Sequence, residues 1–455
     1  MSPRDASLPA EDAPLTGEAL AAAEARYDKF IWANLKRNFA AHYIHGMLGM
    51  TGFRLVNAPT FIPAYLHALT GSDAIVGLGL GLQQLGGVFS PIVGASQVEH
   101  RKRVLPAAML MGTLMRLPIL GMALAGWFAP RPLQIWIFLA LLFLMGIFSG
   151  AQRVVFQFLL SKMIPVSRRG KLQAARNVTG GIIAAVLSYI AGRYLIGGNV
   201  LGNGYATTFL IAFVLTSLGI SVFRLLVREP EPPGLRPQTP LAERMRGFRQ
   251  LVNSDKDYRN FLIAQTLAMA GRVAAPFYIL YAAQEVSGGA MSGKELGLFS
   301  VVYLGADTVS NALWGVLGDK FGFRSNFLAA LVLWIAATAV LLTAHTLAPM
   351  LVAFFGLGAA QAGYMMAAQT LVLEFGDRHD VPMRLAISTT VEAAVSTVAP
   401  FLGGLLAAAG GYVSVFAISM VFYALALATL TIGVREPRLR KQKVIEALDE
   451  EGRGG

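Results

Sequence analysis

Apolar segments recur along the whole chain, and each is long enough to cross a lipid bilayer as a helix of about 20 residues. We count twelve in the 455 residues, at about 38–67, 74–95, 104–128, 133–161, 172–195, 206–227, 259–283, 295–317, 325–345, 349–374, 384–408 and 411–434. Only 14% of the residues are charged, against roughly a quarter in soluble domains, and the mean hydropathy is +0.56. The sequence therefore predicts an all-α membrane protein with twelve transmembrane helices.

The polar stretches divide the chain into five parts. We expect a cytoplasmic N-terminal tail at 1–37, a six-helix bundle at 38–228, a cytoplasmic linker at 229–258, a second six-helix bundle at 259–434 and a cytoplasmic tail at 435–455. Within the first tail, Tyr27, Ile31 and Leu35 form one stripe of an amphipathic helix over 16–36. This helix is expected to lie on the membrane surface or on the cytoplasmic face.

The positive charges are concentrated in short loops between the apolar spans, and this pattern does not indicate a nucleic-acid-binding surface. The formal net charge is +12, and the loops near 96–103, 163–171, 318–325 and 375–384 hold ten Lys and Arg, whereas those on the other side hold two. Cytoplasmic loops of membrane proteins carry this excess of basic residues. We therefore place both termini and the linker in the cytoplasm, and expect the lipid bilayer, not nucleic acid, as the partner.

Two stretches of the chain repeat one pattern. Gly77 to Glu99 is an apolar span that closes on an acid and a basic turn, and Gly297 to Asp319, 220 residues later, has the same length and ending. The repeat predicts a chain built from two related halves.

The second copy continues into Gly315-x-x-x-Asp319-Lys320-x-Gly322-Phe323-Arg324. This segment resembles the loop signature G-x-x-x-D-R/K-x-G-R-R/K of the major facilitator superfamily and departs from it only at Phe323. The first copy is degenerate, with Lys102 in place of the second Gly, and P-V-S-R-R-G at 165–170 resembles the superfamily's loop after the fourth span. The resemblance covers about 38–434 and implies two pseudo-symmetric bundles around a central cavity that alternate access by rocking.

The loop charges are candidates for gates on the cytoplasmic side. An acid at a helix end can lie against the N-terminus of a neighbouring helix and pair with an arginine. Glu99 and Asp319 are the candidate acids, Arg169 and Arg384 are candidate partners, and Arg324 closes the signature. The simpler alternative is that these are solvated loop charges.

Arg54 and Arg272 lie near the middle of the first span of each half, and each precedes a proline, Pro59 or Pro276. A charge at this depth costs at least about 2.5–3.5 kcal/mol, so it needs a partner. Two related arginines on cavity-lining helices would bind a carboxylate or phosphate, and the sequence from Arg54 resembles the first span of organophosphate/phosphate antiporters. The alternative is internal salt bridging.

Two acids within the spans could form such internal salt bridges. Asp307 shares a polar stripe with Tyr303, Ser310 and Asn311, and lies at a depth similar to that of Arg272. It is either a proton-coupling site or a structural partner of Arg272. Glu392, nearer the cytoplasm, has the same two interpretations.

Uncharged polar residues in the spans are further candidates for substrate binding. They are Asn57, Gln265, Gln361 and Tyr364. Because membrane helices also use polar side chains to pack together, each has a structural alternative.

The sequence has no Walker A motif, no zinc-binding His-x-x-x-His motif, no catalytic triad and no cysteine. We therefore expect no enzyme activity, cofactor or metal. The predicted function is transport of a small organic anion by alternating access, by a monomer in the bacterial cytoplasmic (inner) membrane. Coupling of this transport to protons is a further hypothesis. The alternatives are a lipid or amphiphile transporter of the same fold, and a non-transporting assembly factor or sensor.

Overall fold

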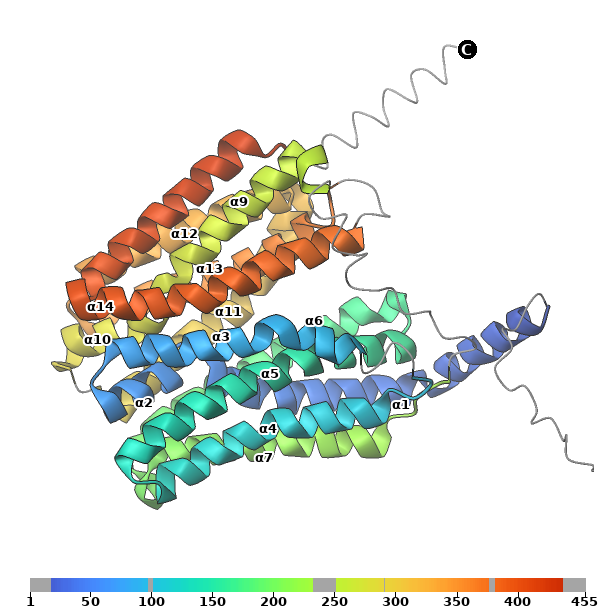
Figure 1. Ribbon diagram of the computed structural model, residues 1–455, viewed down its shortest axis with the longest axis horizontal. Coiled ribbons are helices and arrows are strands. Elements are labelled where there is room, and N and C mark those ends of the chain that lie inside the picture. The colour runs from blue at the N-terminus through green and yellow to red at the C-terminus, as the bar shows by residue number, and fades with distance from the viewer. Residues whose placement is uncertain (1–17, 97–100, 232–250, 290, 376–380, 437–455) are drawn as a thin grey trace, which may run out of the picture.

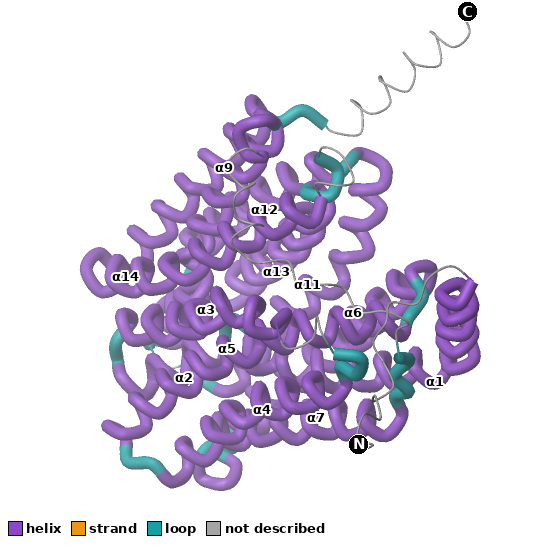
Figure 2. Tube along the Cα trace, turned by 45° about the vertical axis from the view of Figure 1, so that its right-hand side comes forward, coloured by secondary structure: helices purple, strands orange, loops and turns teal. Residues whose placement is uncertain are grey.

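The computed structural model describes residues 18–96, 101–231, 251–289, 291–375 and 381–436. Within these ranges the chain is helical and contains no strand (Figures 1 and 2). The helices are α1 (Glu18–Asn57), α2 (Phe61–Thr70), α3 (Asp73–Ser96), α4 (Leu105–Phe128), α5 (Arg131–Met163), α6 (Val166–Ile190), η1 (Ala191–Ile196), η2 (Val200–Gly202), α7 (Gly204–Leu226), α9 (Lys256–Gly271), η3 (Arg272–Phe277), α10 (Tyr278–Ser287), α11 (Gly293–Phe321), α12 (Phe323–Thr343), α13 (Leu347–Leu371) and α14 (Val381–Gly433).

The predicted all-α membrane architecture is confirmed. Nine helices of the described ranges are long and apolar enough to cross a membrane. The last of them, in α14, contains Gly411 in the left-handed region at a φ of 73°, so it comprises two passages rather than one. With this division, and with α1 and α3 added, the helices account for the twelve predicted spans.

The first span of each half is broken at its proline. Pro59 lies between α1 and α2, and Pro276 lies in the 3₁₀ segment η3 between α9 and α10. Proline lacks an N–H and clashes with the preceding turn, so it interrupts a helix. At membrane depth such irregular backbone is tolerated only inside protein or along a cavity. The two breaks therefore mark where the interior of the molecule should be hollow.

The two halves pack together along α3 with α14 and along α6 and η1 with α11 (Figure 1). Following the loop charges, we call the end that carries residues 71–72 and 288–289 the outward end and the opposite end cytoplasmic. Gly77 of α3 lies against α14 near the outward end, where a Cβ would meet the Pro400 carbonyl and lie 2.9 Å from the Cα of Gly404. Glycine is required there because two backbones approach closely.

Side chains also join the halves at the outward end. The Tyr412 hydroxyl donates to Asp73 Oδ1 at 2.9 Å, and His67 Nδ1 lies 3.0 Å from the same oxygen. Deeper in, the Ser300 hydroxyl donates to Thr60 Oγ1 at 2.9 Å. The hydrogen bonds of Tyr412 with Asp73 and of Ser300 with Thr60 therefore connect the two halves.

The N-terminal amphipathic helix is not a separate element. Its described part, from Glu18, continues without a break into the first span as α1, which projects beyond its neighbours in Figure 1. The Tyr27 hydroxyl donates to the Lys162 carbonyl at the end of α5, at 3.1 Å. The described part of this helix therefore contacts the end of α5, and its predicted placement relative to the membrane remains a prediction. Most of the linker and of the C-terminal tail lies outside the described residues.

Replacing Gly77 by alanine should force α3 and α14 apart. We expect a loss of stability of about 1–3 kcal/mol, the usual cost of overpacking, seen as a lower midpoint of thermal unfolding in detergent. Gly305→Ala is the matched control, because a Cβ at Gly305 meets nothing within 4 Å. Equal midpoints for the two variants would contradict the close packing of these helices.

Candidate functional site

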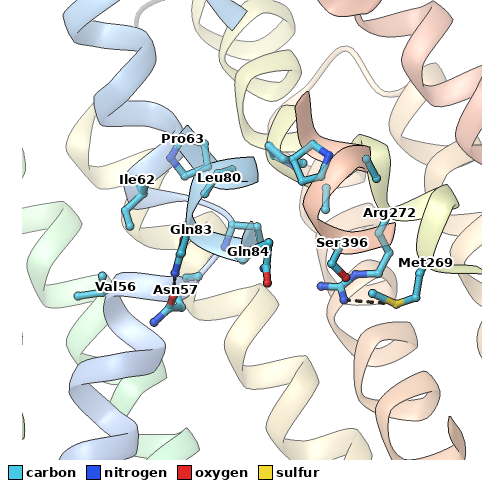
Figure 3. A pocket seen from close by; sticks show the side chains of 16 residues that line it. Val56, Asn57, Ile62, Pro63, Leu80, Gln83, Gln84, Met269, Arg272 and Ser396 are labelled. Carbon is cyan, nitrogen blue, oxygen red and sulfur yellow. Dashed lines mark hydrogen bonds between the residues drawn. The ribbon is translucent and has the colours of Figure 1, made fainter. Parts of the chain in front are cut away.

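A cavity of about 180 Å³ lies between the halves at the two helix breaks (Figure 3). Its walls come from the end of α1, from α2 and α3, from η3 with the end of α9, and from α14. The residues that line it are Val56, Asn57, Ala58, Pro59, Ile62, Pro63, Leu80, Gln83, Gln84, Met269, Arg272, Ala275, Pro276, Ser396, Ala399 and Pro400. The broken backbone at Pro59 and Pro276 thus faces a cavity, as its depth in the membrane requires.

Arg272 is the charged residue of this cavity. Its Nη1 lies 3.9 Å from the sulfur of Met269, and it forms no salt bridge with a carboxylate among the described residues. In Figure 3 its guanidinium lies beside Met269 and Ser396, across the cavity from Asn57. The cavity therefore offers one guanidinium to a ligand.

The opposite wall carries amides. Gln83 Nε2 donates to Asn57 Oδ1 at 2.6 Å, and Gln84 follows on the same helix. Asn57 therefore lines the cavity, and its role in substrate binding stays a prediction. Gln84 and Met269 were not predicted. Gln84 could have been predicted, because it is a polar residue in an otherwise apolar span. Nothing in the sequence distinguishes Met269 from a packing residue.

Arg54 does not line the cavity. Its Nη1 lies 3.4 Å from Asp307 Oδ2 and donates to Thr308 Oγ1 at 3.0 Å, both on α11 of the other half. The structure therefore pairs Asp307 with Arg54 and not with Arg272. Arg54 and Arg272, the proposed anion clamp, do not converge in this state.

A glycine on α6 allows Arg54 to reach across. A Cβ at Gly181 would lie 2.6 Å from Arg54 Nη1 and would also collide with the Thr308 side chain. The ion pair thus requires a small residue in the fifth span as well as the two charges.

The remaining residues predicted to bind substrate do not line the cavity. Gln265 is buried and its Oε1 accepts a hydrogen bond from Ser388 at 2.7 Å. Tyr364 is fully buried against Phe327 and Trp334. Gln361, on α13, is partly exposed but does not line the cavity.

Glu392 is an acid on which the charge of the cavity's arginine acts. It is partly buried on α14, and the charges that act on it are those of Arg272 and Arg153. Arg153 comes from α5 of the first half. Glu392 therefore lies in a field of two positive charges without a salt bridge to either among the described residues.

The predicted gating arginines make contacts within their own halves. Arg169 donates to the carbonyls of Ser161 and Ile164 at the end of α5, at 2.7 and 2.8 Å. Arg324 donates to the Thr431 carbonyl at 3.0 Å. Arg384 is buried and forms a 2.8 Å salt bridge with Asp255.

The two predicted acids do not appear in these contacts. Asp319 lies exposed at the end of α11, and Glu99 is outside the described residues. A pairing of either acid with these arginines remains a prediction.

A buried acid at the cytoplasmic end was missed. Glu229 accepts from the backbone N–H groups of Val104 and Leu105 at 2.7 and 2.8 Å, and pairs with Lys162 at 2.6 Å. It thus caps the N-terminus of α4, where a negative charge is favourable. The sequence places Glu229 in the linker, because its neighbours are polar and rich in proline.

Comparison with known proteins identifies the architecture. The pattern of the Major Facilitator Superfamily matches residues 44–255 and 260–451. The chain belongs to this superfamily. It is a multi-pass membrane transporter of small molecules, and not an enzyme.

Similar proteins agree with this assignment. The multidrug resistance protein MdtG of Salmonella schwarzengrund is 24% identical over 401 residues, which cover 85% of this chain and 92% of that protein. MdtG of Escherichia fergusonii is 25% identical over 399 residues, with 85% and 91% covered.

Solved structures show the same fold. A D-xylose-proton symporter superposes with a TM-score of 0.67 at 14% identity, covering 89% of this chain and 99% of that one. The nucleoside transporter NupG gives 0.62 at 12% identity, covering 87% and 97%.

A double-mutant cycle on Arg54→Ala and Asp307→Ala should reveal the ion pair between the halves. We expect an interaction energy of about 0.5–3 kcal/mol in thermal or denaturant unfolding, because each single change leaves a partly buried charge without its partner. The control cycle pairs Arg54→Ala with Glu392→Ala and should be additive. An additive first cycle would show that the two charges do not interact in the membrane.

Proposed function

We propose that this protein transports a small organic anion with an apolar body across the bacterial inner membrane by alternating access, acting as a monomer. The observation that carries the proposal is Arg272, which lines the cavity without a carboxylate partner. An arginine at this depth is costly unless something neutralises it. A bound anion would supply that partner.

The rest of the cavity favours an amphiphilic substrate. Most of its lining is apolar, with prolines, alanines and aliphatic side chains around a single cation and a few amides. Ligand sites typically have this composition, with few polar groups that fix orientation. Their usual volume is roughly 300–1,000 Å³, so the cavity of about 180 Å³ fits a small ligand or the anionic end of a larger one.

The second candidate is a carrier of lipids or larger amphiphiles. Apolar walls around one charged group are the feature that would favour it, and the cavity has that feature. The similar proteins named for multidrug resistance support the same reading. The third candidate is a non-transporting assembly factor or sensor. A salt bridge between Arg272 and Asp307 that seals the cavity would favour it. Because Asp307 pairs with Arg54 instead, this candidate lacks that support.

A thermal-shift screen tests the substrate class. Purified protein is heated with phosphorylated, carboxylated and lipid-like anions, and with neutral analogues of each hit. We expect stabilisation by anions that carry an apolar group, and loss of that stabilisation in Arg272→Ala. Arg131→Ala, at an exposed position at the start of α5, is the matched control and should respond as the wild type does. Stabilisation that survives Arg272→Ala would contradict binding at this arginine.

We further propose that the pair of Arg54 and Asp307 couples transport to protons. A proton on Asp307 would remove the charge that holds Arg54, and with it a tie between the first span and the eighth. Movement of the halves would then be easier after protonation. Glu392, in the field of Arg272, is the other candidate for proton binding.

Asp307→Asn should therefore uncouple the transporter. Because the amide cannot exchange a proton, we expect loss of transport driven by a pH gradient but retention of substrate exchange across vesicle membranes at equal pH. Asp28→Asn, at an exposed position on α1 outside every candidate site, controls for the loss of an acid elsewhere in the protein. Wild-type coupling in Asp307→Asn would exclude this role.

A further inference from the structure

We propose that the cytoplasmic end of the first half carries a binding site for the headgroup of an anionic phospholipid. The site is a groove of about 610 Å³ beside the extended part of α1. It is lined by Phe30, Arg103, Leu105, Pro106, Val227, Arg228, Glu229, Pro230 and Glu231. These residues come from α1, from the start of α4 and from the chain that leaves α7, so the groove is separate from the central cavity.

The acids in its wall are already neutralised. Glu229 is paired with Lys162, both side chains being 5% exposed, and Glu231 is paired with Arg103 at 2.7 Å. Neither carboxylate is left to oppose an incoming anion.

Arginines without a carboxylate partner among the described residues lie at this end of α7. Arg228 lines it, and Arg224 lies on the last turn of α7, both side chains being exposed and without an ion pair among the described residues. Arg37 on α1 donates to the carbonyls of Leu225 and Leu226, at 3.2 and 2.6 Å, and brings a third guanidinium to the end of α7. Three cations without an acid partner are the complement of a phosphate group.

The apolar surface below the arginines identifies the source of that phosphate as a lipid. Leu225 and Leu218 on α7 are 75% and 52% exposed, and Leu110 on the neighbouring α4 is 56% exposed. Such side chains face acyl chains when the protein is in a membrane. Phe30, which is 40% exposed, lines the groove, and aromatic residues are common at membrane interfaces.

The charge also lies on the expected side of the membrane. The loops place this end in the cytoplasm, where the leaflet is rich in anionic lipids and each basic residue near the surface adds attraction. An anionic lipid here would hold the extended part of α1 against α4 and α7.

Native mass spectrometry of the full chain in detergent, with an equimolar mixture of phosphatidylglycerol and phosphatidylcholine, tests the site. We expect the wild type to retain phosphatidylglycerol preferentially, and Arg224→Gln with Arg228→Gln to lose that preference by about five-fold per arginine. Arg224→Lys with Arg228→Lys keeps the charges and should keep most of the preference. Thermal unfolding without added lipid checks that each variant is folded.

The control removes two exposed arginines elsewhere, Arg131→Gln with Arg168→Gln, and should retain the preference. Equal retention of the two lipids by the wild type, or an unchanged preference in the glutamine variant, would overturn the proposal. So would an equal loss in the control, which would indicate a general effect of net charge. Displacement of the lipid by an equal concentration of glycerol phosphate would show a site for soluble anions instead.

Discussion

Charges and unpaired backbone groups are costly in hydrocarbon, and the placement of both organises this transporter. The backbone is interrupted at Pro59 and Pro276, where the helix cannot satisfy its own hydrogen bonds. Both interruptions lie on the wall of the cavity between the halves. The same cost that excludes irregular backbone from the lipid face therefore places it where a substrate can reach it.

The two arginines that precede these breaks illustrate how a repeated unit becomes asymmetric. Arg54 and Arg272 occupy related positions, yet Arg54 reaches across to Asp307 of the other half whereas Arg272 lines the cavity. The position that corresponds to Asp307 in the first repeat is Gly87, so Arg272 has no equivalent acid to reach. One substitution between the copies thus leaves one arginine engaged in a tie between the halves and the other open to a ligand.

Much of the architecture was predictable, because hydropathy and loop charge act through length and composition alone. The twelve spans and the repeat both follow from local patterns. The partner of Asp307 did not follow, because depth along two helices does not say which of them face each other. Glu229 was missed for a related reason: a polar, proline-rich context reads as a solvated linker, and its burial depends on where Lys162 and the start of α4 lie.

The sequence by itself therefore determined that this chain is a twelve-helix membrane protein built from two related halves. Hydrocarbon imposes the spans on any chain of this composition, because each must be apolar, helical and about as long as the bilayer is thick. The tertiary structure alone decided which charges meet. Pairing depends on the rotation and spacing of the helices, and these are set by contacts between residues far apart in the chain, such as Gly181 beneath Arg54 and Gly77 against Gly404.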